Sequence, residues 1–204
     1  MISLLRKEQY DLLSALTING EILDLGGVKS SGYHNLIKGN HRITTANILT
    51  AEADLMVNAE AAFNLPEQSY DAVICLNLFE HLFNFQNAAN ESFKVLKQGG
   101  ELVGSTPFMF HVHGSPDDYF RYTGSALEKI LKQAGFKEIE IKELGSGLFG
   151  IIYQTTISFY RFNWLSALAR HVFLFLDKVV NKIWPNDLLS KKYFPVGYFF
   201  RAKK

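Results

Sequence analysis

The sequence is poor in the residues that mark several special classes of protein. Its 204 residues include 1 cysteine, 2 tryptophans and 5 prolines. The lone Cys75 excludes a disulfide framework and a multi-thiol zinc site, and it is typical of a reducing compartment. No run of 18 uncharged apolar residues occurs, so we expect no membrane-spanning helix. Charges near the start interrupt the apolar stretch that a secretory signal needs, so we expect a cytoplasmic protein.

Neither sign of charge dominates the sequence. The 21 Lys and Arg nearly balance the 20 Asp and Glu, which argues against nucleic acid as a partner. The balance hides a division along the chain. Residues 1–144 carry 12 basic and 18 acidic side chains, a net of −6, whereas residues 145–204 carry 9 and 2, a net of +7. Apolar residues make up 48%, enough to bury the core of a single domain over residues 1–204.

Strands and helices are expected to alternate through the first part of the chain. The expected strands are 21–25, 41–47, 55–57, 70–76, 101–105 and 136–143, with a closing strand at 195–202. The expected helices are 2–16, 86–97, which Gly99-Gly100 stops, and 124–134, which Gly135 stops. This alternation predicts an α/β sheet with helices on both faces. Ligands of such sheets bind beyond the carboxyl ends of the strands, here near residues 26–27, 47, 77–81 and 107–123.

A strand followed by an acid and two glycines occurs at residues 21–27 (EILDLGG). Glycine lets the backbone approach a ligand closely, and Asp24 can orient the turn or accept a hydrogen bond from a ligand ammonium group. The G-x-G-x-x-G pattern of dinucleotide sites is absent, because Val28 follows Gly27. A plain strand-to-helix turn explains this segment equally well.

Four segments in order resemble the class I S-adenosylmethionine-dependent methyltransferases, and within them the type-11 group. The segments are EILDLGG, NAEAAFNLPEQSYDAVICLNLFEHL, VLKQGGELVGSTPF and HVHGSPDDYFRYTGSALEKILKQAGF. The resemblance covers residues 20–144 and the closing strand, and it implies a Rossmann-like, mostly parallel seven-stranded sheet with an antiparallel closing strand. It also implies S-adenosylmethionine as cofactor and methyl transfer, to oxygen, on a small-molecule, glycan or lipid-linked acceptor.

The resemblance assigns eight residues to the cofactor site. They are Asp24, Gly26, Gly27, Asn47, Asn58, Ala59, Leu76 and Asn77. Asn47 occupies the ribose position and Asn58 the adenine position, where the family usually has acids, and Val28 replaces a second spaced glycine. A neutral acceptor makes weaker hydrogen bonds than an ionised one, so we expect reduced cofactor affinity. These departures favour the alternative of a non-catalytic binding or scaffold protein with a degenerate cofactor site.

The loop before the helix at 124–134 holds the catalytic candidates. The resemblance points to His113 as a base or substrate binder. Arg121 is expected to hold an anionic group or to pair with Asp117 or Asp118. The structural alternative is that these side chains only fold the loop, with Thr123 capping the following helix. No HExxH or paired Cys/His spacing occurs, so we expect no metal site.

Residues 145–192 separate a core of residues 1–144 from the closing strand at 195–202. The segment is rich in aromatic residues with Arg and Lys at intervals, which predicts one or two amphipathic helices. Three interpretations remain open: helices packed over the substrate cleft, a peripheral contact with the inner face of a membrane, or a homodimer interface.

Overall fold

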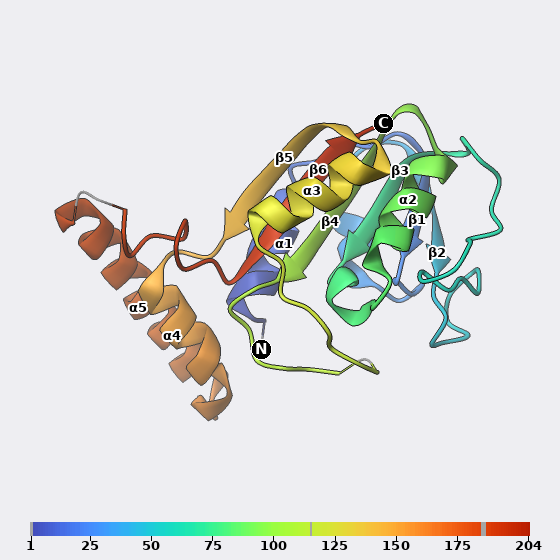
Figure 1. Cartoon of the computed structure of the whole chain (residues 1–204). Helices are drawn as coiled ribbons and strands as arrows, with labels where there is room; N and C mark the ends of the chain where they lie inside the picture. Colours follow the sequence, from blue (N-terminus) through green and yellow to red (C-terminus); the bar gives the residue numbers. More distant parts are fainter. Residues whose placement is uncertain (1, 115, 185–186) are drawn as a thin grey trace.

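Six strands form one sheet in the computed structural model, which describes residues 2–114, 116–184 and 187–204. They are β1 (Gly20–Leu25), β2 (His41–Ala46), β3 (Tyr70–Leu76), β4 (Leu96–Pro107), β5 (Lys137–Leu144) and β6 (Gly197–Lys203). Their order across the sheet is β2-β1-β3-β4-β6-β5. Neighbours from β2 to β4 are parallel, whereas β6 is antiparallel to β4 and β5. The mostly parallel sheet with an antiparallel closing strand is confirmed (Figure 1).

The seventh strand expected at residues 55–57 is not confirmed, and the sheet of the described chain has six strands. This segment makes a single parallel bridge, between Leu55 and Ala46. Asn47 accounts for the short pairing, because its Oδ1 accepts a hydrogen bond from the amide of Leu49 (2.8 Å). A side-chain oxygen thus takes the backbone donor that a ladder continued to residue 57 would use.

Helices cover both faces of the sheet, as expected (Figure 1). On one face lie α2 (Phe85–Val95) and α3 (Gly124–Ala134), and on the other lies α1 (Leu4–Leu13), which α4 (Leu148–Thr156) contacts. Short 3₁₀ turns occur at η1 (Gly32–Leu36), η2 (Phe79–His81) and η3 (Ile157–Phe159). Alternate residues of β3 enter the two cores: Val73 packs with α2 and α3, whereas Ile74 packs with α1. Burial on both faces explains why this strand is continuously apolar.

The glycine stop predicted for α3 is confirmed, whereas the one predicted for α2 is not. Thr123 caps α3 through a 3.3 Å hydrogen bond from the amide of Ala126, and Gly135 ends that helix with φ +103°, as predicted. The predicted stop of α2 at Gly99-Gly100 is wrong, because α2 ends at Val95 and both glycines lie inside β4. The glycines lie where the β3–β4 register shifts, and Gly99 has φ +77°.

Two helices, α4 and α5 (Asn163–Ile183), lie between β5 and β6 and project together from one side of the sheet (Figure 1). Asp177 of α5 caps α4: its carboxylate accepts hydrogen bonds from the amides of Phe149 (3.0 Å) and Gly150 (2.7 Å) and from the hydroxyl of Ser146 (2.5 Å). Within the described residues, no helix is long and apolar enough to cross a bilayer. The division into a core and an inserted segment stays a prediction.

Replacing Asp177 by Asn is expected to lower the free energy of unfolding by about 2 kcal/mol. In the wild type, the backbone N–H groups of Phe149 and Gly150 donate to the two carboxylate oxygens of Asp177. The side-chain NH2 group of the buried Asn would replace one of these oxygens, so one backbone N–H group would lose its acceptor. Urea unfolding measures the loss, with the exposed Asp187→Asn as the matched control. Equal stability of the two variants would contradict the capping role.

Candidate functional site

Two adjoining cavities open at the carboxyl ends of β1 and β3, where the sequence places the ligand. Their volumes are about 330 Å³ and about 290 Å³. Both are lined by Gly26, Asn77 and His81, so they are two halves of one cleft. The first half also borders on α1 and the second on the loop after β2.

Asp24 lies beneath the first cavity and does not line it. This carboxylate is fully buried, and its Oδ2 lies 2.7 Å from the hydroxyl of Tyr33 and 2.6 Å from Nε2 of His34. A Cβ at Gly27 would lie 1.8 Å from the same oxygen. The acid therefore orients the turn, which is one of its two expected roles, and position 27 has no space for a side chain.

Asn47 uses both ends of its side-chain amide within the protein. Its Nδ2 donates to the carbonyl of Gly26 (2.8 Å), and its Oδ1 accepts from the amide of Leu49 (2.8 Å). Gly26 itself has φ +88°, a conformation that favours glycine. Asn47 lines the second cavity and stabilises the glycine turn, which leaves only part of its acceptor capacity for a ribose.

The remaining expected cofactor residues also border the cleft. Asn58 and Ala59 line the second cavity, Leu76 the first, and Asn77 both. Oδ1 of Asn58 accepts from the amide of Glu60 (2.9 Å), so this side chain closes a local turn. Except for the buried Asp24, every residue assigned to the cofactor lies on the cleft wall.

Helix α1 contributes a wall that the sequence interpretation missed. Nε2 of Gln9 donates to Oδ1 of Asn77 (2.7 Å) and to the hydroxyl of Ser105 (2.8 Å), although Gln9 is 1% exposed. Arg6 lines the same cavity and is exposed. Gln9 follows Leu5 by four residues, so it lies on the apolar face of the helix. A polar side chain on that face indicates a buried polar contact, and this pattern could have revealed it.

Asp118 organises the loop between β4 and α3. Its carboxylate pairs with both terminal nitrogens of Arg121 and accepts from the amide of His113 (2.8 Å). These guanidinium hydrogen bonds hold the pKa of Asp118 well below its usual range. Arg121 also donates to the carbonyls of Phe120 (2.9 Å) and His111 (3.1 Å), and it does not line the cleft. Of its two expected arrangements, the structure has the ion pair.

His113 lines the first cavity, opposite the glycine turn. Its Nδ1 lies 3.3 Å from the carbonyl of His111 and 3.4 Å from Oδ2 of Asp118, so we assign the ring proton to Nδ1. Nε2 then keeps a lone pair. Burial lowers the pKa of His113, which favours the neutral ring at pH 7.

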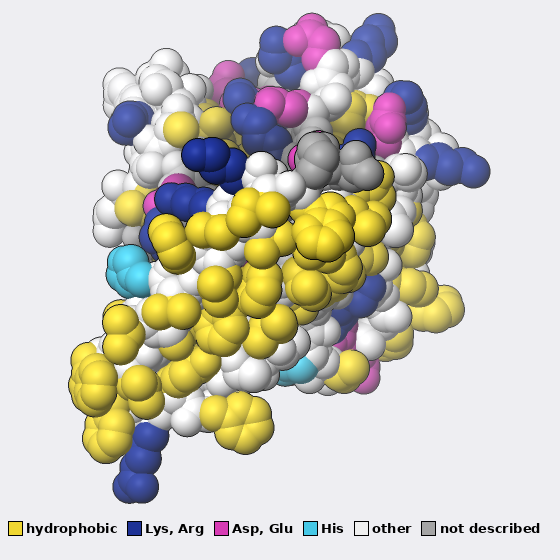
Figure 2. Space-filling model, turned by 90° about the vertical axis from the view of Figure 1, so that its left-hand side faces the viewer, with side chains coloured by type: hydrophobic (Ala, Val, Ile, Leu, Met, Phe, Trp, Pro, Cys, Tyr) yellow, Lys and Arg dark blue, Asp and Glu magenta, His cyan; other side chains and the backbone are white. Residues whose placement is uncertain are grey.

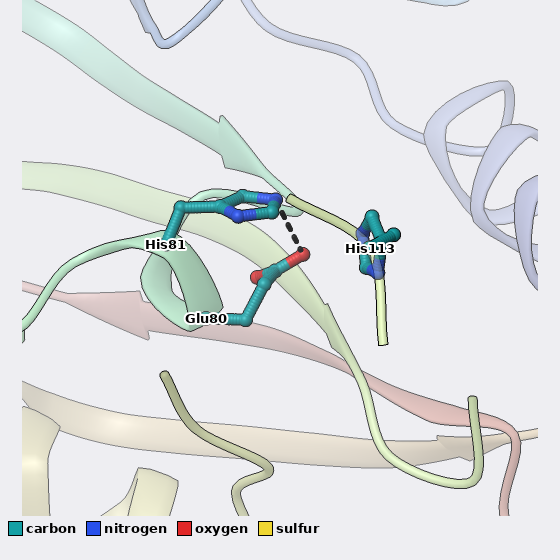
Figure 3. A group of neighbouring side chains, drawn as sticks. All are labelled: Glu80, His81 and His113. Carbon is teal, nitrogen blue, oxygen red and sulfur yellow. Dashed lines mark ion pairs between the residues drawn. The ribbon is translucent and has the colours of Figure 1, made fainter. Parts of the chain in front are cut away.

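The carboxyl group of Glu80 points toward the rings of His81 and His113, although Glu80 itself lines neither cavity (Figure 3). Its carboxyl group is 0% exposed and has no hydrogen-bond partner among the described residues. Burial raises its pKa to about 8, so the group is mostly protonated at pH 7. His81 lies 3.7 Å from this carboxyl through Nε2 and 2.6 Å from the carbonyl of Asp117 through Nδ1.

The three side chains could hold a divalent cation, since one ligand atom from each lies within 4.8 Å of the others. A proton on Glu80 competes with that role. The expectation of no metal stays a prediction.

Residues 37–104 match the family model described as a methyltransferase domain. The match includes the second of the four ordered segments (58–82) and most of the third (95–108), and it confirms the resemblance to methyltransferases over that part of the chain. No curated protein matches the chain.

Solved structures share the fold at low sequence identity. Phosphoethanolamine N-methyltransferase 2 of Haemonchus contortus, in complex with S-adenosyl-L-methionine, aligns with 97% of this chain and 51% of its own (TM-score 0.59, 16% identity). A methyltransferase of Archaeoglobus fulgidus aligns over 97% and 90% (TM-score 0.57, 16% identity). The [4+2]-cyclase SpnF aligns over 98% and 81% (TM-score 0.61, 16% identity). The chain thus spans about half the length of the first enzyme, and such identities show the fold alone.

Replacing Glu80 by Gln is expected to change the pH dependence of stability. Because burial raises the pKa of Glu80 from 4.5 to about 8, the folded protein holds a proton that the unfolded chain releases between these values. The contribution of Glu80 to the free energy of unfolding of the wild type therefore falls as the pH rises from 4.5 to about 8. Gln does not titrate, so the variant shows no such fall. The stability of Glu80→Gln relative to wild type should increase by up to about 1.4 kcal/mol per pH unit.

Urea unfolding between about pH 5 and about pH 8 tests this trend. The groups near Glu80 are His81, His113, Arg121 and Asp118, and all four remain in the variant. Glu128→Gln, on the exposed surface of α3, is the control. A flat difference across the window would contradict a neutral Glu80.

Proposed function

We propose that the chain, whose residues 37–104 match a methyltransferase domain, transfers the methyl group of S-adenosylmethionine to a hydroxyl oxygen. The acceptor is a small molecule, a glycan or a lipid-linked molecule. One observation carries the proposal. A glycine turn without space for a side chain and an imidazole with a lowered pKa line the same cavity, at Gly27 and His113.

The residues of the cleft suit the two ends of such a cofactor. Gly26, Gly27, Leu76 and Asn77 would hold the methionine part in the first cavity. Asn47, Asn58 and Ala59 would border the ribose and adenine in the second. When bound, the cofactor supplies a methyl group on a positively charged sulfur, which is reactive without further activation. The protein has mainly to align the acceptor and to remove its proton.

His113 suits the role of general base. Asp118 and the carbonyl of His111 hold Nδ1–H, so Nε2 is free to accept the proton of an acceptor hydroxyl. The O–H bond breaks as the Nε2–H bond forms, and the oxygen gains the electron pair that it needs as a nucleophile. The carboxylate of Asp118 then stabilises the imidazolium.

Arg121 acts as a positioning residue in this scheme, because it is committed to Asp118 and to backbone carbonyls. Arg6 is the better candidate to bind an anionic group. It lines the first cavity, and it makes no ion pair within the described residues.

A non-catalytic binding protein is the second candidate, and Asn47 favours it. The amide of this residue is used by Gly26 and Leu49, at a position where an acid would otherwise receive the ribose hydroxyls. If this loss closes the cofactor site, the fold serves binding alone. The [4+2]-cyclase among the structural neighbours carries a different named activity on the same fold.

Isothermal titration with S-adenosylmethionine and S-adenosylhomocysteine separates the two candidates. We expect the wild-type chain to bind both and Gly27→Ala to bind at least about tenfold more weakly, because the new Cβ would lie 1.8 Å from Oδ2 of Asp24. Gly32→Ala is the matched control, since nothing lies within 4 Å of its new Cβ. Failure of the wild type to bind either compound would favour the non-catalytic protein.

Replacing His113 by Ala is expected to lower kcat about 10² to 10⁴-fold once an acceptor is known, while the affinity for S-adenosylhomocysteine stays unchanged. His111→Ala is the control, because the exposed His111 side chain does not line the cleft. If both variants keep wild-type turnover, His113 is not the base.

A further inference from the structure

Helix α5 has its polar and apolar residues in an unusual arrangement. Its two buried residues are the polar Ser166 and Asp177. Both bind α4: Ser166 through the hydroxyl of Tyr153 at 3.0 Å, and Asp177 by capping the first turn. Trp164 and Phe175 of the same helix are 67% and 63% exposed. The polar groups thus hold the helix pair together, and an apolar stripe faces outward.

The stripe has three apolar side chains on one side of α5, at spacings of four and seven residues and each more than half exposed: Trp164, Leu168 and Phe175. We call the surface that carries them the outer face. Figure 2 shows a broad, nearly unbroken hydrophobic surface on the side of the molecule where α4 and α5 project. A contiguous exposed apolar surface of this kind marks a site of interaction with another protein or with a membrane.

The charges beside the outer face are almost all positive. The segment 145–192 holds six Lys and Arg and two acids, a net of +4, and one of the acids is the buried Asp177. Exposed basic side chains include Arg161, Lys178 and Lys182. Lys and Arg lie along the margin of the apolar surface and beyond its lower end (Figure 2). None of these three makes an ion pair in the part of the chain that the structure describes.

We propose that the outer face docks on the surface of a membrane that contains anionic lipids. Aromatic and aliphatic side chains would enter the boundary between headgroups and acyl chains, and the basic side chains would meet the phosphates. A second copy of the chain fits less well. A two-fold contact pairs a patch with itself, so it would bring the positive margins together. This docking does not depend on the proposed methyl transfer.

Flotation of the full chain with vesicles tests the proposal. We expect binding to vesicles of phosphatidylcholine with phosphatidylglycerol, much weaker binding to phosphatidylcholine alone, and a decline as salt is added. The double variant Lys178→Glu/Lys182→Glu should bind at least about tenfold more weakly. Trp164→Ser/Phe175→Ser should lose binding to both kinds of vesicle.

Matched controls place the same changes elsewhere. Lys129→Glu/Lys132→Glu reverses two charges on α3, and Met56→Ser removes an apolar side chain that is 80% exposed; both should bind like wild type. Thermal unfolding shows that each variant is folded. Absence of vesicle binding by wild type, or equal binding to neutral and anionic vesicles, overturns the proposal. So does a dimer in light scattering that Trp164→Ser/Phe175→Ser abolishes without any vesicle binding, which would assign the face to a second copy.

Discussion

The buried carboxylate of Asp24 is the constraint on which the cleft depends. A buried carboxyl group needs hydrogen-bond partners, and Tyr33 and His34 of the turn η1 supply them to its Oδ2. Their hydrogen bonds draw the chain after β1 over the end of the sheet, and the carboxylate occupies the space beside Gly27. The shape of the ligand wall is thus set by an acid that does not line it.

A second acid, Asp118, likewise positions a residue of the cleft, because it holds the backbone of His113. Asp118 accepts hydrogen bonds from Arg121 and from the backbone amide of His113, and so fixes the described part of the loop between β4 and α3. The carboxyl group of Glu80 has no hydrogen-bond partner in the part of the chain that the structure describes, and it stays mostly neutral at pH 7. Two of the three acids are ion-paired or hydrogen-bonded, and the third is kept uncharged. Burial disfavours a carboxylate charge that has no partner, so a buried acid either gains hydrogen bonds or stays protonated.

The sequence predicted elements that follow from local rules and missed those that depend on distant contacts. The bounds of β3 agree with the apolar run 70–76, and Thr123 and Gly135 bound α3 as expected. The strand at 55–57 was not confirmed, because its pairing with β2 stops after one bridge, between Leu55 and Ala46. Most cofactor positions reached the cleft wall, but the partners of Asn47 and the contribution of Gln9 could not be inferred from spacing. Such contacts join residues that are far apart in the sequence, so they depend on the complete three-dimensional structure.

Helix α1 touches both the cleft and the projecting helices. Gln9 contacts Asn77 in the cleft, and the amide of Leu4 donates to Oε1 of Gln154 in α4 at 3.0 Å. Ten residues therefore join two surfaces that lie on different parts of the molecule. If filling the cleft changes the position of α1, the free energies of the events at the two surfaces are coupled. Thermodynamic reciprocity then makes the effect equal in both directions: whatever covers α4 and α5 alters the affinity of the cleft by the same factor.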